Sequence, residues 1–125
     1  MTKVLISGSR SIQVLPQEAV ESIDRIIAQN FDIIIGDAFG VDNLVQQYLR
    51  QRKYQKVVVY YAKYNSFGKP RNTNGYPAVS VNGNYEARDK FMCLIADYGL
   101  AIWDGCSRGT KANIDRVKLT RVIKI

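Results

Sequence analysis

Short apolar runs alternate with amphipathic stretches along the whole chain, and this alternation limits the fold more than any other feature. Three early runs are wholly aliphatic: Val4-Leu5-Ile6, Ile33-Ile34-Ile35 and Val57-Val58-Val59. Unbroken apolar runs are typical of parallel strands whose two faces are both covered. The pattern predicts strands at 3–7, 32–35, 56–62, 100–103 and 121–125.

The segments between these runs show helical spacing. A set of apolar residues at i, i+3, i+4, i+7 and i+8 marks one face of a helix: Val41, Leu44, Val45, Tyr48 and Leu49. The same reasoning predicts helices at about 16–30, 41–49, 87–98 and 108–118. In the third of these, the spacing places Phe91 and Leu94 on the inner face.

Strict alternation of strands and helices predicts an α/β fold. We expect a Rossmann-like three-layer sandwich with a mainly parallel five-stranded sheet in the order 3-2-1-4-5. The order 2-1-3-4-5 is an alternative that the sequence leaves open. A chain of 125 residues has the usual size of one domain, so residues 1–125 are predicted to form a single domain.

Residues 63–84 interrupt the alternation. They contain Pro70, Pro77 and the glycines Gly68, Gly75 and Gly83 among many Asn and Ser residues. A long loop without secondary structure is uncommon in a compact domain and is often functional. We therefore predict a long functional loop at 63–84.

Composition narrows the classes of partner and chemistry. The net charge of +7 favours anionic partners, and the absence of histidine removes His-based acid–base chemistry and most zinc sites. The two cysteines lack metal-type spacing, so we expect free thiols, no metal, no cofactor and a cytoplasmic location. The sequence has no apolar run of roughly 20 residues, the length that a membrane span needs, and the first apolar run is too short for a signal peptide.

In a parallel sheet the loops that follow the strands meet at one edge, where ligands bind. Three such loops combine glycine with hydroxyl or charged side chains: Ser7-Gly8-Ser9-Arg10, Gly36-Asp37-Ala38-Phe39-Gly40-Val41-Asp42 and Asp104-Gly105-Cys106-Ser107-Arg108-Gly109-Thr110. Each has a structural alternative, because glycines end strands and Ser107 or Asp42 can cap a helix. Together, in a basic chain, they favour an anion site. They match neither the Walker A pattern nor G-x-G-x-x-G.

Two residues near these loops are candidates for catalysis. Arg88 lies near the start of the third predicted helix, where the helix dipole disfavours a cation, and this suggests an anionic ligand or an acidic partner. Asp104 follows the fourth predicted strand and is expected to face a sugar or a reacting centre. Among the tyrosines in or beside the long loop, one of Tyr64, Tyr76 and Tyr85 is a candidate to stack on a base.

The set SGSR (7–10), GDAFGVD (36–42), EARDKFM (86–92) and ADYGLAIWDGCSRGT (96–110) resembles the SLOG superfamily and, more narrowly, its YspA-like branch. This superfamily includes the LOG phosphoribohydrolases and the Rossmann domain of Smf/DprA. The resemblance covers nearly the whole chain. It implies a nucleotide-binding edge formed by these residues: Gly8, Ser9, Arg10, Gly36, Asp37, Gly40, Asp42, Arg88, Gly105, Ser107, Gly109 and Thr110. It also implies a dimer or a higher homo-oligomer.

LOG enzymes cleave the N-glycosidic bond of nucleoside 5′-monophosphates with an arginine and a glutamate. By resemblance, Arg88 occupies the arginine position, whereas Asn113 stands where the glutamate is expected. An amide cannot act as a carboxylate base. The first expectation is therefore a binder of an ADP-ribose-like ligand, a cyclic nucleotide or a nucleoside monophosphate, which acts as a sensor or sequestering module. The alternatives are an N-glycosidase, with Arg88 and Asp104 as catalytic residues, and a protein that binds single-stranded nucleic acid.

Overall fold

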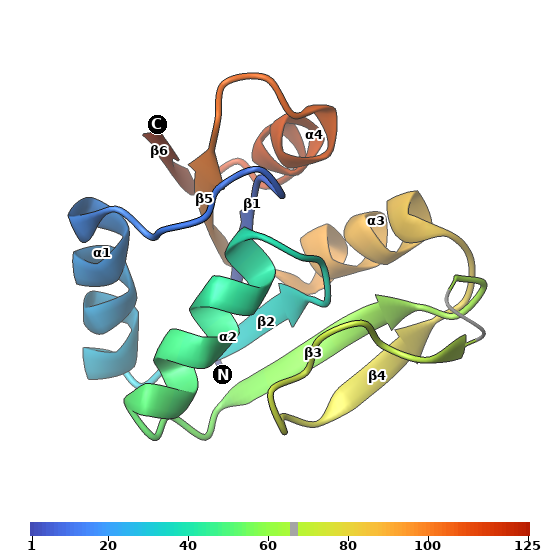
Figure 1. Cartoon of the computed structure of the whole chain (residues 1–125), viewed down its shortest axis with the longest axis horizontal. Helices are drawn as coiled ribbons and strands as arrows, with labels where there is room; N and C mark the ends of the chain where they lie inside the picture. Colours follow the sequence, from blue (N-terminus) through green and yellow to red (C-terminus); the bar gives the residue numbers. More distant parts are fainter. Residues whose placement is uncertain (66–67) are drawn as a thin grey trace.

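The computed structural model describes residues 1–65 and 68–125 as an α/β structure. In these residues, strands and helices alternate along most of the chain (Figure 1). The strands are β1 (Lys3–Gly8), β2 (Asp32–Gly36), β3 (Val57–Ala62), β4 (Ala78–Val81), β5 (Tyr98–Trp103) and β6 (Thr120–Lys124). The helices are α1 (Gln17–Ala28), α2 (Val41–Gln51), α3 (Tyr85–Ile95) and α4 (Arg108–Arg116).

The strands form one parallel sheet in the order β4-β3-β2-β1-β5-β6. The α/β fold and the parallel sheet are therefore confirmed. The five predicted strands lie in the predicted relative order, with β1 between β2 and β5. The predicted number of strands was wrong, because β4 extends the sheet beyond β3.

Strand β4 corrects the prediction of a long loop at 63–84. Its residues pair with β3 in the register Val59↔Ala78 to Ala62↔Val81. The strand is only four residues long and largely exposed, so it carries no periodic apolar signal, and glycine and asparagine residues surround it. Residues 66–67 of the predicted loop lie outside the described residues.

Helices cover both faces of the sheet. On one face, α1 and α2 pack against the larger core cluster, to which Ile23, Val45 and Leu49 contribute. On the other face, α3 and the end of α4 enclose a smaller cluster around Leu5, Ile34 and Met92. Figure 1 shows α1 and α2 apart from α3 and α4. The three-layer arrangement explains why the central strands are apolar on both faces.

The inner face of α3 differs from the prediction. Met92 and Cys93 are buried together with Arg88, whereas Phe91 is 39% exposed and Leu94 is 81% exposed. The predicted spacing was wrong because it carried the helix through Tyr98, which begins β5. The observed register instead turns Arg88 toward the centre of the molecule, where it meets acidic partners.

Candidate functional site

A cavity of about 410 Å³ lies at the carboxyl edge of the sheet. Strand β1 pairs there with both β2 and β5, and the helices that follow these strands lie on opposite faces of the sheet. A crevice forms at such a point in parallel α/β sheets. Its volume is within the range of small-molecule sites, which is about 300–1,000 Å³.

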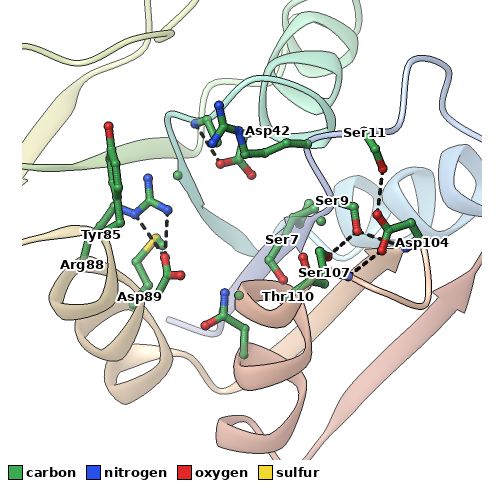
Figure 2. Close-up of a pocket in the computed structure, with 18 of the residues that line it drawn as sticks. Ser7, Ser9, Ser11, Asp42, Tyr85, Arg88, Asp89, Asp104, Ser107 and Thr110 are labelled. Atoms are coloured by element: carbon green, nitrogen blue, oxygen red, sulfur yellow. Dashed lines mark hydrogen bonds and ion pairs between the residues drawn. The ribbon is translucent and has the colours of Figure 1, made fainter. Parts of the chain in front are cut away.

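The cavity has two chemically different sides. Figure 2 shows Tyr85, Arg88 and Asp89 of α3 on one side, and Ser9, Ser107, Thr110 and Asp104 on the other. The α3 side carries charged groups of both signs. The opposite side carries hydroxyl groups and the first turn of α4.

The first turn of α4 presents unpaired backbone amides. A helix has no internal acceptors for its first N–H groups, and the Ser107 side chain makes no capping hydrogen bond to α4. Its Oγ lies instead 2.7 Å from the Oγ of Ser9. The first turn of α4 contains no acidic residue. A Cβ atom added to Gly109 would meet no atom within 4 Å, so the backbone at this position is open to the cavity.

Separate contacts position Ser9 and Ser107, one through the Ser9 hydroxyl and one through the Ser107 backbone. Ser9 Oγ accepts a hydrogen bond from the Asp104 amide at 3.0 Å, and the Ser107 carbonyl accepts one from Trp103 Nε1 at 3.0 Å. Because the two hydroxyl groups share one hydrogen bond, one hydroxyl proton is left to donate elsewhere. The pair is thus a fixed donor beside the first turn of α4.

Asp104 organises the turn before α4. Its Oδ1 accepts hydrogen bonds from the amides of Cys106 and Ser107, both at 2.8 Å, and its Oδ2 accepts one from Ser11 Oγ at 2.7 Å. The two amide hydrogen bonds, with the Ser11 contact, hold the pKa of Asp104 well below its ordinary value. These contacts favour a structural role for the carboxylate, and its catalytic role stays a prediction.

The charged side of the cavity is built around Arg88. This guanidinium donates to Asp37 Oδ1 at 2.7 Å and to Asp89 Oδ1 at 2.9 and 3.1 Å. Asp37 also accepts hydrogen bonds from the Arg71 amide and guanidinium, at 2.8 and 2.9 Å. Burial raises the pKa of Asp37, but these contacts with Arg71 outweigh it, and the net pKa is lowered. Arg88 and Arg71 therefore each have a carboxylate partner within the protein.

Asp42 is the buried carboxyl group of the cavity. It lies in the first turn of α2, is only 5% exposed and accepts a hydrogen bond from the Ala38 amide at 3.0 Å through Oδ2. Gly36 allows this placement, because a Cβ atom there would lie 2.6 Å from Asp42 Oδ2. Burial raises the pKa of Asp42 to about 7, despite the opposing effect of Arg88.

The structure brings most of the predicted site residues to one cavity. The predicted residues that line it are Gly8, Ser9, Arg10, Gly36, Asp42, Arg88, Asp104, Ser107, Gly109 and Thr110. Three predicted residues do not line it: Asp37, Gly40 and Gly105. Asp37 lies behind Arg88, and the two glycines form turns with φ of +74° and +82°. A Cβ atom at Gly40 would also lie 2.5 Å from the Arg10 backbone.

Some lining residues were absent from the predicted site. These are Ile6, Ser7, Ser11, Ala38, Arg71, Asp89 and Met92. Arg71 belongs to the predicted loop, and its guanidinium lies 4.2 Å over the ring of Tyr85. No local pattern marks it, because its position depends on tertiary contacts with Asp37. Asp89 directly follows Arg88, and this adjacency of opposite charges was the available signal.

Of the three candidate tyrosines, Tyr85 alone lines the cavity. Tyr76 is buried in the core and donates to the Tyr54 carbonyl at 2.7 Å, whereas Tyr64 is 76% exposed. Asn113, at the position of the expected glutamate, also lines the cavity. Its Oδ1 accepts contacts from Cys93 Sγ at 3.4 Å and from Arg116 at 3.2 Å.

Comparison of the chain with protein-family models, with curated proteins and with solved structures found no match. In residues 1–65 and 68–125, no helix has the length and apolar character needed to cross a membrane. The same residues contain no group of three or more His, Cys, Asp or Glu side chains placed to hold a metal ion.

Proposed function

We propose that the cavity binds a nucleotide or a nucleotide-derived ligand, and that the protein acts as a sensor or a sequestering module. The observation that carries this proposal is the convergence of the uncapped first turn of α4 with the hydroxyl groups of Ser9, Ser107 and Thr110. Unpaired amides at a helix start attract phosphate, and the helix dipole adds to this attraction.

The rest of the cavity suits the remainder of such a ligand. Arg10 lines the cavity and supplies a cation on its β2–α2 side, where its guanidinium lies 6.0 Å from the centre of the Phe39 ring. On the α3 side, Tyr85 and the carboxylate of Asp89 offer an aromatic surface and an acceptor for a sugar hydroxyl group, and Asp42 of α2 lines the same part of the cavity. The resemblance to the SLOG superfamily supports the same class of ligand.

The substitution Gly109→Val tests the position of the phosphate. A Cβ atom added at this position would meet no atom within 4 Å, and valine is no worse in a helix than glycine. We expect the variant to remain folded and to lose at least about tenfold in affinity for AMP, cyclic AMP or ADP-ribose, so that each nucleotide raises its melting temperature less than that of the wild type.

The matched control is Lys111→Val, which places the same side chain at an exposed position of α4 that does not line the cavity. This variant is expected to bind like the wild type. If none of the three nucleotides raises the melting temperature of the wild type, or if Gly109→Val binds them unchanged, the proposed function is wrong.

N-glycosidase activity is the second candidate, and the buried carboxyl of Asp42 is the observation that favours it. Asn113 carries no carboxyl group, and the Asp104 carboxylate is held ionised, so neither can donate a proton. Incubation of the protein with nucleoside 5′-monophosphates, followed by chromatography, measures any release of base. Activity that is lost in Asp42→Asn would support this function, whereas no release would exclude it for those substrates.

A further inference from the structure

Asp42 is placed to recognise a ligand directly. The residue is only 5% exposed, and it lines the cavity. Oδ2 is occupied by the Ala38 amide, and no protein hydrogen-bond donor meets Oδ1 in the described part of the chain. Oδ1 is unpaired but not fully enclosed by protein atoms, so it reaches the open space of the cavity. Figure 2 shows the Asp42 carboxyl group directed toward the interior of the site.

Burial is the main cause of the raised pKa of Asp42, and the charges around it modify this effect. From α3 it faces Arg88 and Asp89, and from the β2–α2 turn it faces Asp37. Arg71, from the segment before β4, and Arg10, from the β1–α1 turn, line the same cavity. Arg88 and Arg71 are already paired with Asp37 and Asp89. The cavity lining and Asp37 together hold three cations, Arg10, Arg71 and Arg88, and four carboxylates, Asp37, Asp42, Asp89 and Asp104, which leave one excess negative charge when all are ionised. Asp37 and Asp89 are ion-paired, and Asp104 accepts hydrogen bonds from two amides and Ser11. The carboxyl group whose charge is least compensated is therefore that of Asp42.

We propose that Asp42 takes up a proton when the cavity binds a phosphorylated ligand, and that the protonated carboxyl donates a hydrogen bond from Oδ1 to an acceptor atom of that ligand. The proton comes from the solvent and forms one O–H bond, while Oδ2 keeps its hydrogen bond from Ala38. This inference rests on the proposed function and adds to it that ligand affinity is coupled to pH.

The direction of the coupling follows from electrostatics. A phosphate adds negative charge to the cavity and displaces water from it, and both effects disfavour an ionised carboxylate nearby. Because burial already raises the pKa of free Asp42 to about 7, ligand binding raises it further. Affinity is therefore greatest below pH 7 and decreases above it, by up to about tenfold for each pH unit.

Other groups of the site do not explain such a change near neutral pH. The chain has no histidine. The pKa values of Asp37 and Asp104 are lowered by their hydrogen bonds, and burial raises the pKa of the Cys93 thiol to about 11. ADP-ribose is the suitable probe, because its pyrophosphate does not titrate between pH 6 and pH 8.

Calorimetric titration of the full chain with ADP-ribose, in two buffers of different ionisation enthalpy, counts the protons directly. At pH 8 we expect the wild type to take up about 0.5–1 proton for each ligand bound. Asp42→Asn keeps an acceptor for the Ala38 amide and resembles the protonated carboxyl group. It should take up no proton and bind with the same affinity at pH 6 and pH 8. The control Asp115→Asn, on the exposed side of α4, should behave like the wild type.

The experiment distinguishes a failure of the inference from a failure of the proposed function. A wild type that binds ADP-ribose with no proton uptake, or an Asp42→Asn variant with the wild-type proton count, overturns the inference and leaves the proposed function standing. If ADP-ribose, AMP and cyclic AMP fail to bind at either pH, the proposed function fails, and the inference fails with it. Should Asp42→Asn not fold, Asp42→Ser provides the comparison, and the wild-type proton count remains decisive.

Discussion

Two aspartates of one cavity differ because their neighbours differ. Asp104 accepts hydrogen bonds from two backbone amides and Ser11, so the protein stabilises its charge. Asp42 accepts a hydrogen bond from one amide and is buried near the carboxylates of Asp37 and Asp89, so the protein disfavours its negative charge. Their pKa values move in opposite directions for these reasons. The identity of a residue in the sequence does not reveal which of these environments it will meet.

The buried Asp42 also predicts a pH dependence of stability. Its pKa is about 7 in the folded protein against an ordinary value of 3.8, so folding takes up a proton between these two pH values. Its contribution is most favourable below pH 3.8 and is lost as the pH rises to 7. The stability of the wild type relative to Asp42→Asn should therefore fall by about 1.4 kcal/mol for each pH unit in that range.

Urea denaturation of both proteins at pH 4.5, 5.5, 6.5 and 8 measures this difference. Comparison with the variant cancels the opposite contributions of Asp37 and Asp104, which both proteins share. The difference should level off above pH 7.5. Stability curves that run parallel from pH 4.5 to pH 8 would show that Asp42 is ionised in the folded protein over the whole range.

Hydrogen bonds fix the segment before β4 to helix α2. Gln46 of α2 is fully buried, and its Nε2 donates to the Gly36 and Asn72 carbonyls at 2.9 and 3.2 Å. Its Oε1 accepts from Asn74 Nδ2 at 2.8 Å. One amide side chain therefore joins the end of β2, helix α2 and the segment that carries Arg71 into the cavity wall.

Gln46→Leu keeps a similar volume and removes all three hydrogen bonds. The groups left unpaired should lower the free energy of unfolding by about 2–4 kcal/mol. The segment around Asn72 should also become more sensitive to limited proteolysis, because it loses two of its attachments. Gln47→Leu, at the exposed neighbouring position, is the control and should change neither measurement. Unaltered stability in Gln46→Leu would contradict this account of the segment.

The elements differ in how far the sequence predicts them. The buried strands β1, β2 and β3 have unbroken aliphatic runs, and α2 has a complete apolar face, so local patterns sufficed. Strand β4 lacks such a pattern, since it exists through its pairing with β3. The register of α3 follows from the burial of Arg88 against Asp37, a contact across 51 residues of sequence. The predicted site was incomplete for the same reason: Arg71 and Asp37 meet only in the folded chain.

At the scale of the whole molecule, the sheet connects the two cores and the cavity. The same central strands contribute Val4 and Ile6 to the core under α1 and α2, and Leu5 to the core under α3. The loops at the ends of these strands form the cavity. Because both cores take residues from the same strands, we expect that neither core unfolds without the other. That residues 1–125 form a single domain stays a prediction, which cooperative unfolding tests.

Urea unfolding should therefore be one cooperative transition with an m value of about 1–3 kcal/mol per molar urea. Trp103, the one tryptophan of the chain, lies in β5 and contacts the turn before α4, so its fluorescence reports on the cavity side of the sheet. Far-ultraviolet circular dichroism reports on all the helices. The two transitions should coincide, and a saturating nucleotide should shift both by the same amount, because a ligand that binds only the folded state stabilises the whole cooperative unit. An earlier transition in the fluorescence alone would mean that the cavity edge unfolds separately from the sheet, and that the single domain is two cooperative units.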